Sequence, residues 1–193
     1  FMELVFGSDD GFLYVLDHDG ILKWRFETKG PVRSTPTLYD IDGDSKLEIL
    51  FGSDDGFLYI LDHRGSLLLN FKTDGAVRSS PALGVFDNLP GVEVVFTSTD
   101  RRIYCVNTSG VLLWSYKTLD RIETSPALLD IDGDGEQEVI VSSQDGTLYV
   151  LKSPPYKVWM FQAYGSILHT PAVTTAGFIY LPSEDKNLYK LYY

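Results

Sequence analysis

The octapeptide GSDDGFLY, Gly7 to Tyr14, recurs letter for letter at residues 52–59, which is 45 residues further along the chain. Looser copies follow at residues 97–104 (TSTDRRIY), 142–149 (SSQDGTLY) and 182–189 (PSEDKNLY). The five copies share an aspartate and, four residues later, a tyrosine. These are Asp10, Asp55, Asp100, Asp145 and Asp185, with Tyr14, Tyr59, Tyr104, Tyr149 and Tyr189. The chain is therefore a tandem repeat, divided at about 1–33, 34–78, 79–123, 124–168 and 169–193.

Each repeat has the pattern of a four-stranded unit. In the second repeat, short apolar or alternating runs occupy residues 34–39, 47–53, 57–62 and 66–72, and turns that contain Asp or Gly separate them. Four strands in about 45 residues are typical of one blade of a β-propeller. A proline heads the first strand of four repeats, which suits an edge strand, since proline cannot donate to a ladder. These residues are Pro36, Pro81, Pro126 and Pro171.

The fold class that we predict is an all-β propeller with four-stranded antiparallel blades. The first repeat lacks its first strand and the last repeat lacks its fourth, so the chain holds about four and a half blades. Residues 1–193 then form a single propeller domain or part of one. A closed ring normally completes one blade from both termini, and these termini do not complement each other. We therefore favour a segment of a larger ring over an incomplete five-sector ring.

Composition narrows the classes of function. The formal net charge of −11 opposes contact with nucleic-acid phosphates, and the sequence shows no basic patch to offset it, so we expect no nucleic-acid partner. We also expect no transmembrane segment, because no apolar stretch approaches the roughly 18 residues of a membrane span. An acidic chain suits a divalent cation instead. The single cysteine, Cys105, cannot form an intrachain disulfide.

Two stretches carry acidic residues at alternate positions, DIDGDSKLE at residues 40–48 and DIDGDGEQE at residues 130–138. Calcium takes about six to eight oxygen ligands, so a short loop binds it by presenting several carboxylates to one centre. We predict one calcium site in each loop, with position 7 contributing its backbone carbonyl. The predicted ligands are Asp40, Asp42, Asp44, Lys46 and Glu48, and Asp130, Asp132, Asp134, Glu136 and Glu138. The last carboxylate comes three residues too early for an EF-hand.

The matching junctions of the other repeats do not keep the three aspartates, and the third repeat has lost two of them. Aligned on Glu93, the third repeat has Val85, Asp87 and Leu89 in place of the three aspartates, and the last repeat shortens the junction to residues 174–177. A hairpin here therefore does not require carboxylates, and four negative charges in nine residues oppose folding without a cation. The role that we assign to calcium is structural, with no open coordination position. The alternative is a solvated acidic turn.

Two related families share motifs with the chain over most of its length. The segments LDHDGILKW (16–24), VNTSGVLLW (106–114) and LKSPPYKVW (151–159) resemble the tryptophan-docking repeat of pyrroloquinoline-quinone-type (PQQ-like) propellers. The second copy has Leu69 instead of tryptophan, where we expect imperfect docking. The two acidic stretches resemble the calcium loops of FG-GAP propellers, the integrin-alpha-like class. In that family the loop joins the first two strands of a blade, which is where our strand assignment also places it.

A meander of four strands places successive loops on opposite faces of the ring. The face opposite the calcium loops carries the SDDG turns and the entries to each first strand, where matching positions hold different residues. The ligand candidates there are Arg33, Arg78, Glu123, Tyr164 and His169, and the alternative is a solvated rim. For the Asp-Gly turns we expect two-residue hairpins of type I′, which would explain the aspartates locally. The three histidines, His18, His63 and His169, have no zinc-ligand spacing.

These observations favour a calcium-stabilised propeller that acts as a binding or scaffolding module for a protein or carbohydrate ligand, rather than an enzyme. Millimolar calcium outside cells suits sites of modest affinity, so we expect an extracellular or periplasmic location. The alternative is part of a PQQ-dependent quinoprotein dehydrogenase, although such enzymes commonly show adjacent cysteines and this chain has Cys105 alone. A carbohydrate-active propeller is a third class, for which the sequence shows no convergent carboxylate pair.

Overall fold

The computed structural model describes residues 3–86, 91–152 and 156–192, and the regular secondary structure within them consists of β-strands alone. Eighteen strands form five antiparallel sheets in this part of the chain. The first three sheets comprise β1 (Leu4–Gly7), β2 (Phe12–Leu16) and β3 (Leu22–Glu27); β4 (Thr37–Tyr39), β5 (Glu48–Gly52), β6 (Phe57–Leu61) and β7 (Leu67–Lys72); and β8 (Ala82–Gly84), β9 (Glu93–Ser98), β10 (Arg102–Asn107) and β11 (Leu112–Lys117). The last two comprise β12 (Ala127–Leu129), β13 (Glu138–Ser142), β14 (Thr147–Lys152) and β15 (Tyr156–Gln162); and β16 (Ala172–Val173), β17 (Phe178–Pro182) and β18 (Leu188–Tyr192).

The sheets have the order that the repeat predicts. Each is a simple meander, with three strands in the first and last sheets and four in the others, so the predicted fold class is confirmed. We call the sheets blades 1 to 5 and their strands A to D, with A missing from blade 1 and D missing from blade 5. Strand A begins directly after its proline in blades 2 to 5 and lies at the edge of its sheet.

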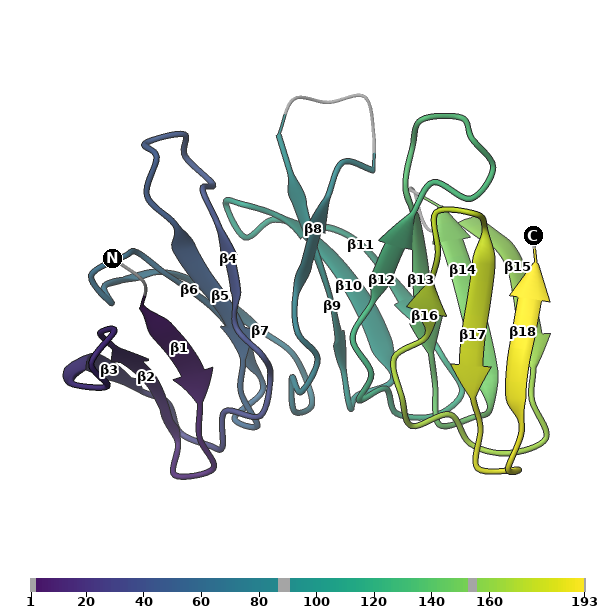
Figure 1. The fold of residues 1–193 in the computed structure, drawn as a ribbon, viewed down its shortest axis with the longest axis horizontal. Coiled ribbons are helices and arrows are strands. Elements are labelled where there is room, and N and C mark those ends of the chain that lie inside the picture. Colours follow the sequence, from purple (N-terminus) through teal and green to yellow (C-terminus); the bar gives the residue numbers. More distant parts are fainter. Residues whose placement is uncertain (1–2, 87–90, 153–155, 193) are drawn as a thin grey trace.

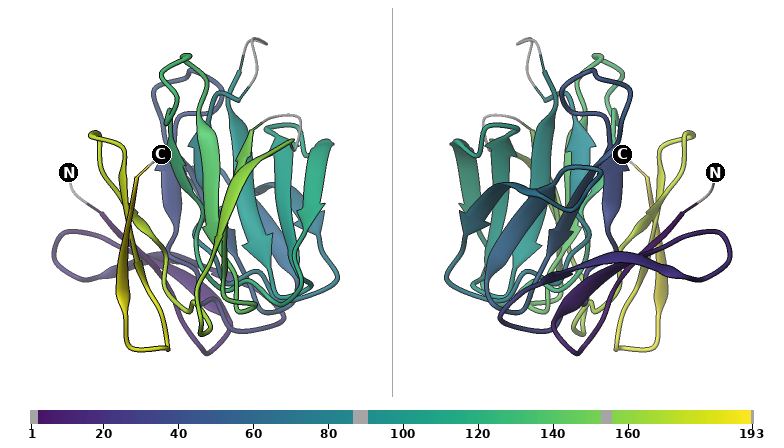
Figure 2. Two further views of the ribbon diagram at one scale, coloured as in Figure 1. Left: turned by 90° about the vertical axis from the view of Figure 1, so that its right-hand side faces the viewer. Right: turned by 90° about the vertical axis from the view of Figure 1, so that its left-hand side faces the viewer.

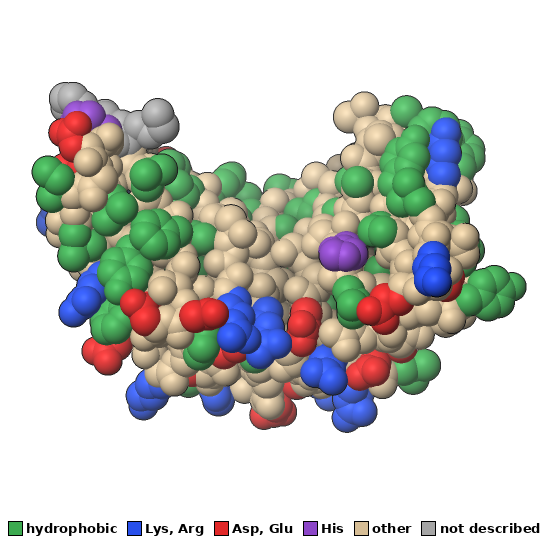
Figure 3. All heavy atoms as spheres, turned by 60° about the horizontal axis from the view of Figure 1, so that its bottom comes forward, with side chains coloured by type: hydrophobic (Ala, Val, Ile, Leu, Met, Phe, Trp, Pro, Cys, Tyr) green, Lys and Arg blue, Asp and Glu red, His purple; other side chains and the backbone are tan. Residues whose placement is uncertain are grey.

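The blades stand side by side along an arc, with blade 1 at one end and blade 5 at the other (Figure 1). Their A strands face the inside of the arc, where β12 lies against β8 and β16. In the space-filling view the molecule is a crescent, hollowed between its two ends (Figure 3). Among the described residues there is no helix with the length and apolarity that crossing a bilayer requires.

The core lies between neighbouring blades, as four apolar clusters. The cluster between blades 2 and 3, for example, joins Leu58 and Val77 of blade 2 to Val94 and Phe96 of blade 3. Strands B and C contribute side chains to both of their faces, which is why β5, β9 and β13 are buried along their whole length. Burying both faces of a sheet in this way is how a stack of thin blades obtains a continuous core.

The tryptophan-type contacts also lie between blades. Trp24 of blade 1 packs on Gly65 in the C–D turn of blade 2, where an added Cβ would stand 2.8 Å from the indole ring. Leu69 of blade 2 meets Gly110 of blade 3 at the matching place, where an added Cβ would stand 2.5 Å from a leucine methyl group. The smaller leucine side chain therefore keeps the contact at the position where we expected imperfect docking.

Candidate functional site

The two faces of the arc carry different kinds of feature. One face, which we call the loop face, is formed by the A–B loops and the C–D turns. Figure 2 shows from both sides that the loops 40–47 (blue) and 130–137 (green) project from it. The other face, which we call the latch face, is formed by the B–C turns and the D–A connections. The predicted separation of the acidic loops from the SDDG turns is confirmed.

In both acidic loops the structure brings three of the predicted ligand side chains together. One carboxylate oxygen from each of Asp40, Asp42 and Glu48 lies within 4.8 Å of the others, and Asp130, Asp132 and Glu138 form the same group. Loop backbone shapes the group, because the first aspartate of each loop accepts two N–H bonds. Asp40 accepts from Gly43 at 2.8 Å and Ser45 at 3.0 Å, and Asp130 accepts from Gly133 at 2.7 Å and Gly135 at 3.0 Å.

The aspartates at position 5 bond lysines and are not members of these groups. Asp44 accepts from the ammonium of Lys46 at 2.8 Å, and Asp134 accepts from that of Lys152. These bonds hold the pKa of each aspartate below its ordinary value. It stays a prediction that further ligands come from Asp44, Asp134 and the backbone carbonyls of Lys46 and Glu136.

The glutamate at position 9 closes its loop with or without the aspartates. Its Oε2 accepts the backbone N–H seven residues earlier: Glu48 from Ile41 at 2.8 Å, and Glu138 from Ile131 at 2.7 Å. Glu93 accepts from Phe86 at 3.1 Å in blade 3, where two of the three aspartates are replaced by Val85 and Leu89. This glutamate is therefore a structural residue of the blade, which the sequence did not reveal. Two of the blade 3 positions used in that comparison, Asp87 and Leu89, lie outside the described residues.

The carboxylate oxygens of the second loop, residues 130–138, match the ligand preference of a hard cation. Glu138 is 1% exposed, and its Oε1 accepts no hydrogen bond, although the Lys152 ammonium lies 3.6 Å away. Burial accordingly raises the pKa of this carboxyl. A buried oxygen beside two further carboxylates provides the oxygen-only ligand chemistry that Ca²⁺ prefers. Asp130, Asp132 and Glu138 would hold the ion, and the matching residues of loop 40–48 would hold a second.

On the latch face the B–C turns differ from our prediction. A type I′ turn needs a positive φ at both central residues. Gly11 has φ +89° and Asp10 is not among the residues with positive φ, while Gly11 N–H donates to Ser8 at 3.2 Å and Ser8 N–H donates to Phe12 at 3.0 Å. The connection is thus a three-residue loop that ends in a left-handed glycine, and the type I′ prediction is wrong. The aspartate at the middle position keeps a negative φ, and its carboxylate accepts hydrogen bonds from its own hairpin, such as those of Asp10 from Phe12 N–H and the Tyr14 hydroxyl.

The repeated aspartate and tyrosine form a latch between blades. In blade 3, Asp100 Oδ2 accepts the Tyr104 hydroxyl at 2.6 Å and the backbone N–H of Asp74 in blade 2 at 3.1 Å. The pairs Asp55–Tyr59, Asp145–Tyr149 and Asp185–Tyr189 repeat this arrangement, with N–H donors from Lys29, Leu119 and Tyr164. Burial and the bond to Asp145 raise the pKa of Tyr149 to about 12. The repeated pair therefore has an inter-blade role as well as a turn role.

Three of the five predicted ligand-face residues lie in one ion-pair network. Arg78 binds Asp54 through two bonds of 2.9 Å and reaches Glu123 at 3.1 Å. Arg33 reaches the same Asp54 at 3.2 Å and Asp9 at 2.8 Å. Figure 3, which brings the latch face toward the viewer, shows charged side chains of both signs along it. The network links blades 1, 2 and 3, so these side chains are held by one another.

The other two candidates are separate from that network. Tyr164 is 94% exposed, and its N–H serves the latch of blade 5. His169 is exposed, and its carbonyl accepts the Ser142 hydroxyl at 2.8 Å. The structure thus does not gather the five residues into one site.

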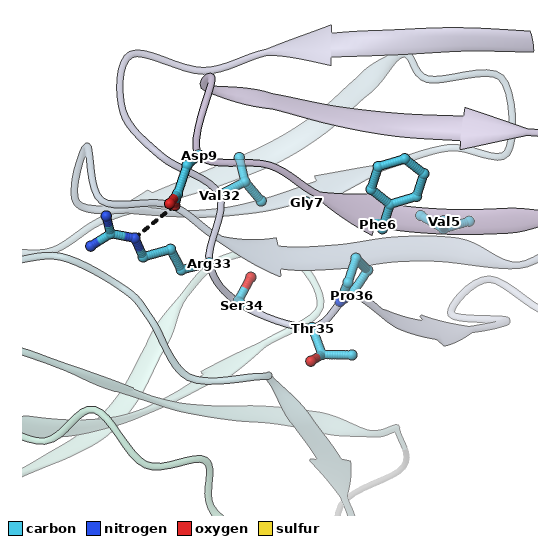
Figure 4. Close-up of a pocket in the computed structure, with 9 residues that line it drawn as sticks. All are labelled: Val5, Phe6, Gly7, Asp9, Val32, Arg33, Ser34, Thr35 and Pro36. Atoms are coloured by element: carbon cyan, nitrogen blue, oxygen red, sulfur yellow. Dashed lines mark hydrogen bonds and ion pairs between the residues drawn. The ribbon is translucent and has the colours of Figure 1, made fainter. Parts of the chain in front are cut away.

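A hollow of about 470 Å³ lies at the end of the arc, between β1 and the entry to β4. Figure 4 shows Arg33 and Asp9 joined at one end of it, with Val5, Phe6 and Pro36 at the other. Its two charged lining residues bind each other, and its remaining lining residues are apolar, small or neutral. Of the side chains that could take part in chemistry, the Asp9 carboxylate is paired with Arg33 and the Ser34 hydroxyl donates to the Gly52 carbonyl at 2.9 Å.

The model of the lambda-carrageenase β-propeller domain matches residues 4–85 and 127–192. The chain belongs to this family. Both acidic loops lie within the matched segments, whereas most of blade 3 lies outside them. No curated protein matches the sequence.

The fold of this chain is similar to that of propellers whose structures have been solved. BamB from Moraxella catarrhalis superposes with a TM-score of 0.76 and 18% identity, over 98% of this chain and 58% of that one. The WD40 β-propeller domain of Doa1 gives a TM-score of 0.71 and 17% identity, over 97% and 60%. The chain thus spans less than two thirds of either structure.

One strained residue in the first acidic loop allows a direct test of loop energetics. Ser45 has φ +66°, a left-handed conformation, where the second loop has Gly135 at φ +91°. Such a conformation costs a non-glycine residue about 1 kcal/mol. We expect Ser45→Gly to raise the free energy of unfolding by about 0.5–1 kcal/mol, measured by urea denaturation. Gly135→Ser is the matched reverse change and should lower the free energy of unfolding, and a shift in the same direction from both changes would contradict this account.

Proposed function

We propose that this propeller is a calcium-stabilised module that binds a protein partner through its latch face, outside the cytoplasm, and carries out no chemistry of its own. One observation carries the proposal. The residue that donates its backbone N–H to each latch is fixed in position, yet its side chain differs from blade to blade. The four residues are Lys29, Asp74, Leu119 and Tyr164.

These four display positions suit recognition of a partner. The latch holds the backbone, so a change of side chain there leaves the blade intact, which is how repeat proteins build specific surfaces. All four are exposed, and Leu119 and Tyr164 are 80% and 94% exposed. Exposed apolar surface can mark an interaction site, and tyrosine is enriched among the residues that contribute most binding energy at protein interfaces. Sequence reasoning selected only Tyr164 of these four, although aligning the repeats at their 45-residue period would have shown all of them.

The calcium part of the proposal rests on the two carboxylate groups and on the buried Glu138 oxygen described above. The ions would fix the A–B loops of blades 2 and 4 and offset part of the acidic charge. Sites in short surface loops have modest affinity, which motivates a calcium-rich location outside the cytoplasm. Their resemblance to FG-GAP loops supports the same assignment.

A carbohydrate ligand is the second candidate. It is favoured by the family match, because the model is named for the β-propeller domain of a lambda-carrageenase. The quinoprotein alternative has less support, since the contact of Trp24 with Gly65 is explained by blade packing. Saturable binding of the quinone, followed by visible absorbance, would restore that alternative.

The binding proposal is tested by removing the apolar anchors. Immobilised protein would capture partners from an extract of its source, and each purified partner would then be titrated by calorimetry. We expect Leu119→Ser with Tyr164→Ser to weaken binding at least tenfold, because interface anchors contribute about 2 kcal/mol or more. The latch bonds are backbone bonds at these positions, so the fold should be kept.

The control is a pair of equally apolar residues away from the latch face. Ile21 and Leu68 are 64% and 56% exposed on blades 1 and 2, and Ile21→Ser with Leu68→Ser should leave binding unchanged. Equal losses from both pairs would contradict a latch-face interface. Saturable binding of a carrageenan oligosaccharide, without a protein partner, would favour the second candidate.

A further inference from the structure

The strand position beside each position 9 glutamate differs between the two acidic loops. In blade 3, Asn107 pairs with Glu93 across strands B and C. Val139 pairs with Leu151 in blade 4, so the next position in that register places Lys152 beside Glu138. Ile49 pairs with Leu61 in blade 2, which in the same way places Asp62 beside Glu48. An amide, a carboxylate and an ammonium thus occupy one structural position.

In blades 2 and 3 this residue caps the C–D turn. Asp62 Oδ1 accepts the N–H groups of Arg64 at 2.8 Å and Ser66 at 2.7 Å. Asn107 Oδ1 accepts those of Ser109 at 3.0 Å and Val111 at 2.9 Å. Lysine has no acceptor and cannot make this cap. Lys152 is therefore released from the turn and directed elsewhere.

The ammonium of Lys152 lies among the carboxylates of loop 130–138. Its Nζ stands 3.2 Å from Asp132 Oδ2 and 3.6 Å from Glu138 Oε1, and it donates to Asp134. Asp132 and Glu138 belong to the group of three carboxylates, so the positive charge stands beside two of the three side chains that would bind a metal ion. The Lys152 side chain is 20% exposed, in keeping with this inward position.

The first loop has no such resident cation in the part of the chain that the structure describes. Its own lysine, Lys46, is 49% exposed and pairs with Asp44, which is outside the carboxylate group. The strand C neighbour of Glu48 is Asp62, which adds negative charge near the loop. The two loops, alike in sequence, therefore differ in the charge that the neighbouring strand supplies.

We propose that Lys152 is a built-in counter-ion that competes with calcium for loop 130–138, so that loop 40–48 binds the ion first. This inference rests on the proposed calcium binding. An ion entering loop 130–138 must displace the ammonium and then share the loop with it at short range, where like charges repel strongly. The same ammonium offsets the acidic charge of the loop when calcium is absent. Blade 4 thereby depends less on calcium than blade 2.

The test isolates the second loop and removes the ammonium. Asp40→Asn with Asp42→Asn silences loop 40–48, and calcium chloride is titrated into the full chain by calorimetry. In this background we expect Lys152→Met to lower the calcium dissociation constant at least tenfold. Lys152→Arg keeps the positive charge, so it should leave the dissociation constant as high as in the background. The melting temperature provides a second measurement. In chelator, the variant with Lys152→Met should have a lower melting temperature than the Asp40→Asn, Asp42→Asn background, and added calcium should raise its melting temperature by more.

The matched control is Lys46→Met in a background where Asp130→Asn and Asp132→Asn silence the second loop. We expect a change of less than threefold there, because Lys46 pairs outside the carboxylate group. An unchanged dissociation constant in Lys152→Met would overturn the inference, while calcium binding by loop 40–48 would still support the proposed function. Failure of wild type and Lys152→Met alike to bind calcium at either loop would overturn both.

Discussion

Adding a chelator to the calcium-loaded protein should lower its melting temperature by about 5–10 °C. A ligand that binds only the folded state stabilises it by about 2.7 kcal/mol when its free concentration is a hundredfold above the dissociation constant. For a chain of this size, each kcal/mol shifts the melting temperature by roughly 2–4 °C. Differential scanning calorimetry at millimolar calcium, with and without chelator, measures the shift.

The same experiment on variants shows whether the acidic loops are responsible. Asp42→Ala with Asp132→Ala removes one member of each carboxylate group, so we expect the calcium-dependent shift to disappear. The control is Glu27→Ala with Asp74→Ala, two exposed acidic residues outside the loops, which changes the net charge equally and should retain the shift. A melting temperature that does not respond to chelator in the wild type would refute calcium stabilisation.

The blade architecture was predictable because every repeat contains the same local information. Strand B, a turn centred on an aspartate, and strand C recur five times, and the prolines mark where strand A begins. Errors in reading one copy are corrected by the others, so the strand number and meander order agree with the structure. The grouping of the first, third and ninth positions of the acidic loops was also predicted, whereas the fifth, at the same alternate spacing, pairs with a lysine instead.

Features that depend on a neighbouring strand or blade could not be read locally. The pairing of Asp134 with Lys152 joins residues 18 apart on different parts of the blade. The latch of Asp100 needs an N–H from the preceding blade, so a turn preference alone suggested the wrong, type I′, explanation. A signal was present all the same. Tyrosine is not required by a turn, and its recurrence with aspartate in all five repeats indicated a shared bond.

The latch should be a large contributor to stability, and Asp100→Ala tests it. Asp100 is half-buried and accepts the Tyr104 hydroxyl, the Arg102 N–H at 3.0 Å and the Asp74 N–H from the neighbouring blade. Its removal leaves the hydroxyl of a tyrosine that is only 7% exposed without this acceptor. Leaving such groups unsatisfied costs about 1–3 kcal/mol each, so we expect a total loss of about 3 kcal/mol. Urea denaturation followed by tryptophan fluorescence measures it.

Asp10→Ala tests the same pair without an inter-blade bond, at a position more exposed than that of Asp100. Asp10 accepts the Tyr14 hydroxyl at 2.6 Å and the Phe12 N–H at 3.2 Å, as the other latches do, but blade 1 lies at the end of the arc. Among the described residues it receives no N–H from another blade, so we expect less than half of the loss seen for Asp100→Ala. The loss of stability from Tyr104→Phe should lie between those of Asp10→Ala and Asp100→Ala. It removes one hydrogen bond and leaves Asp100 with its backbone N–H donors. Equal losses at Asp10 and Asp100 would mean that the aspartate acts through its own turn, and the repeated pair would then be a turn motif rather than the link that joins blades.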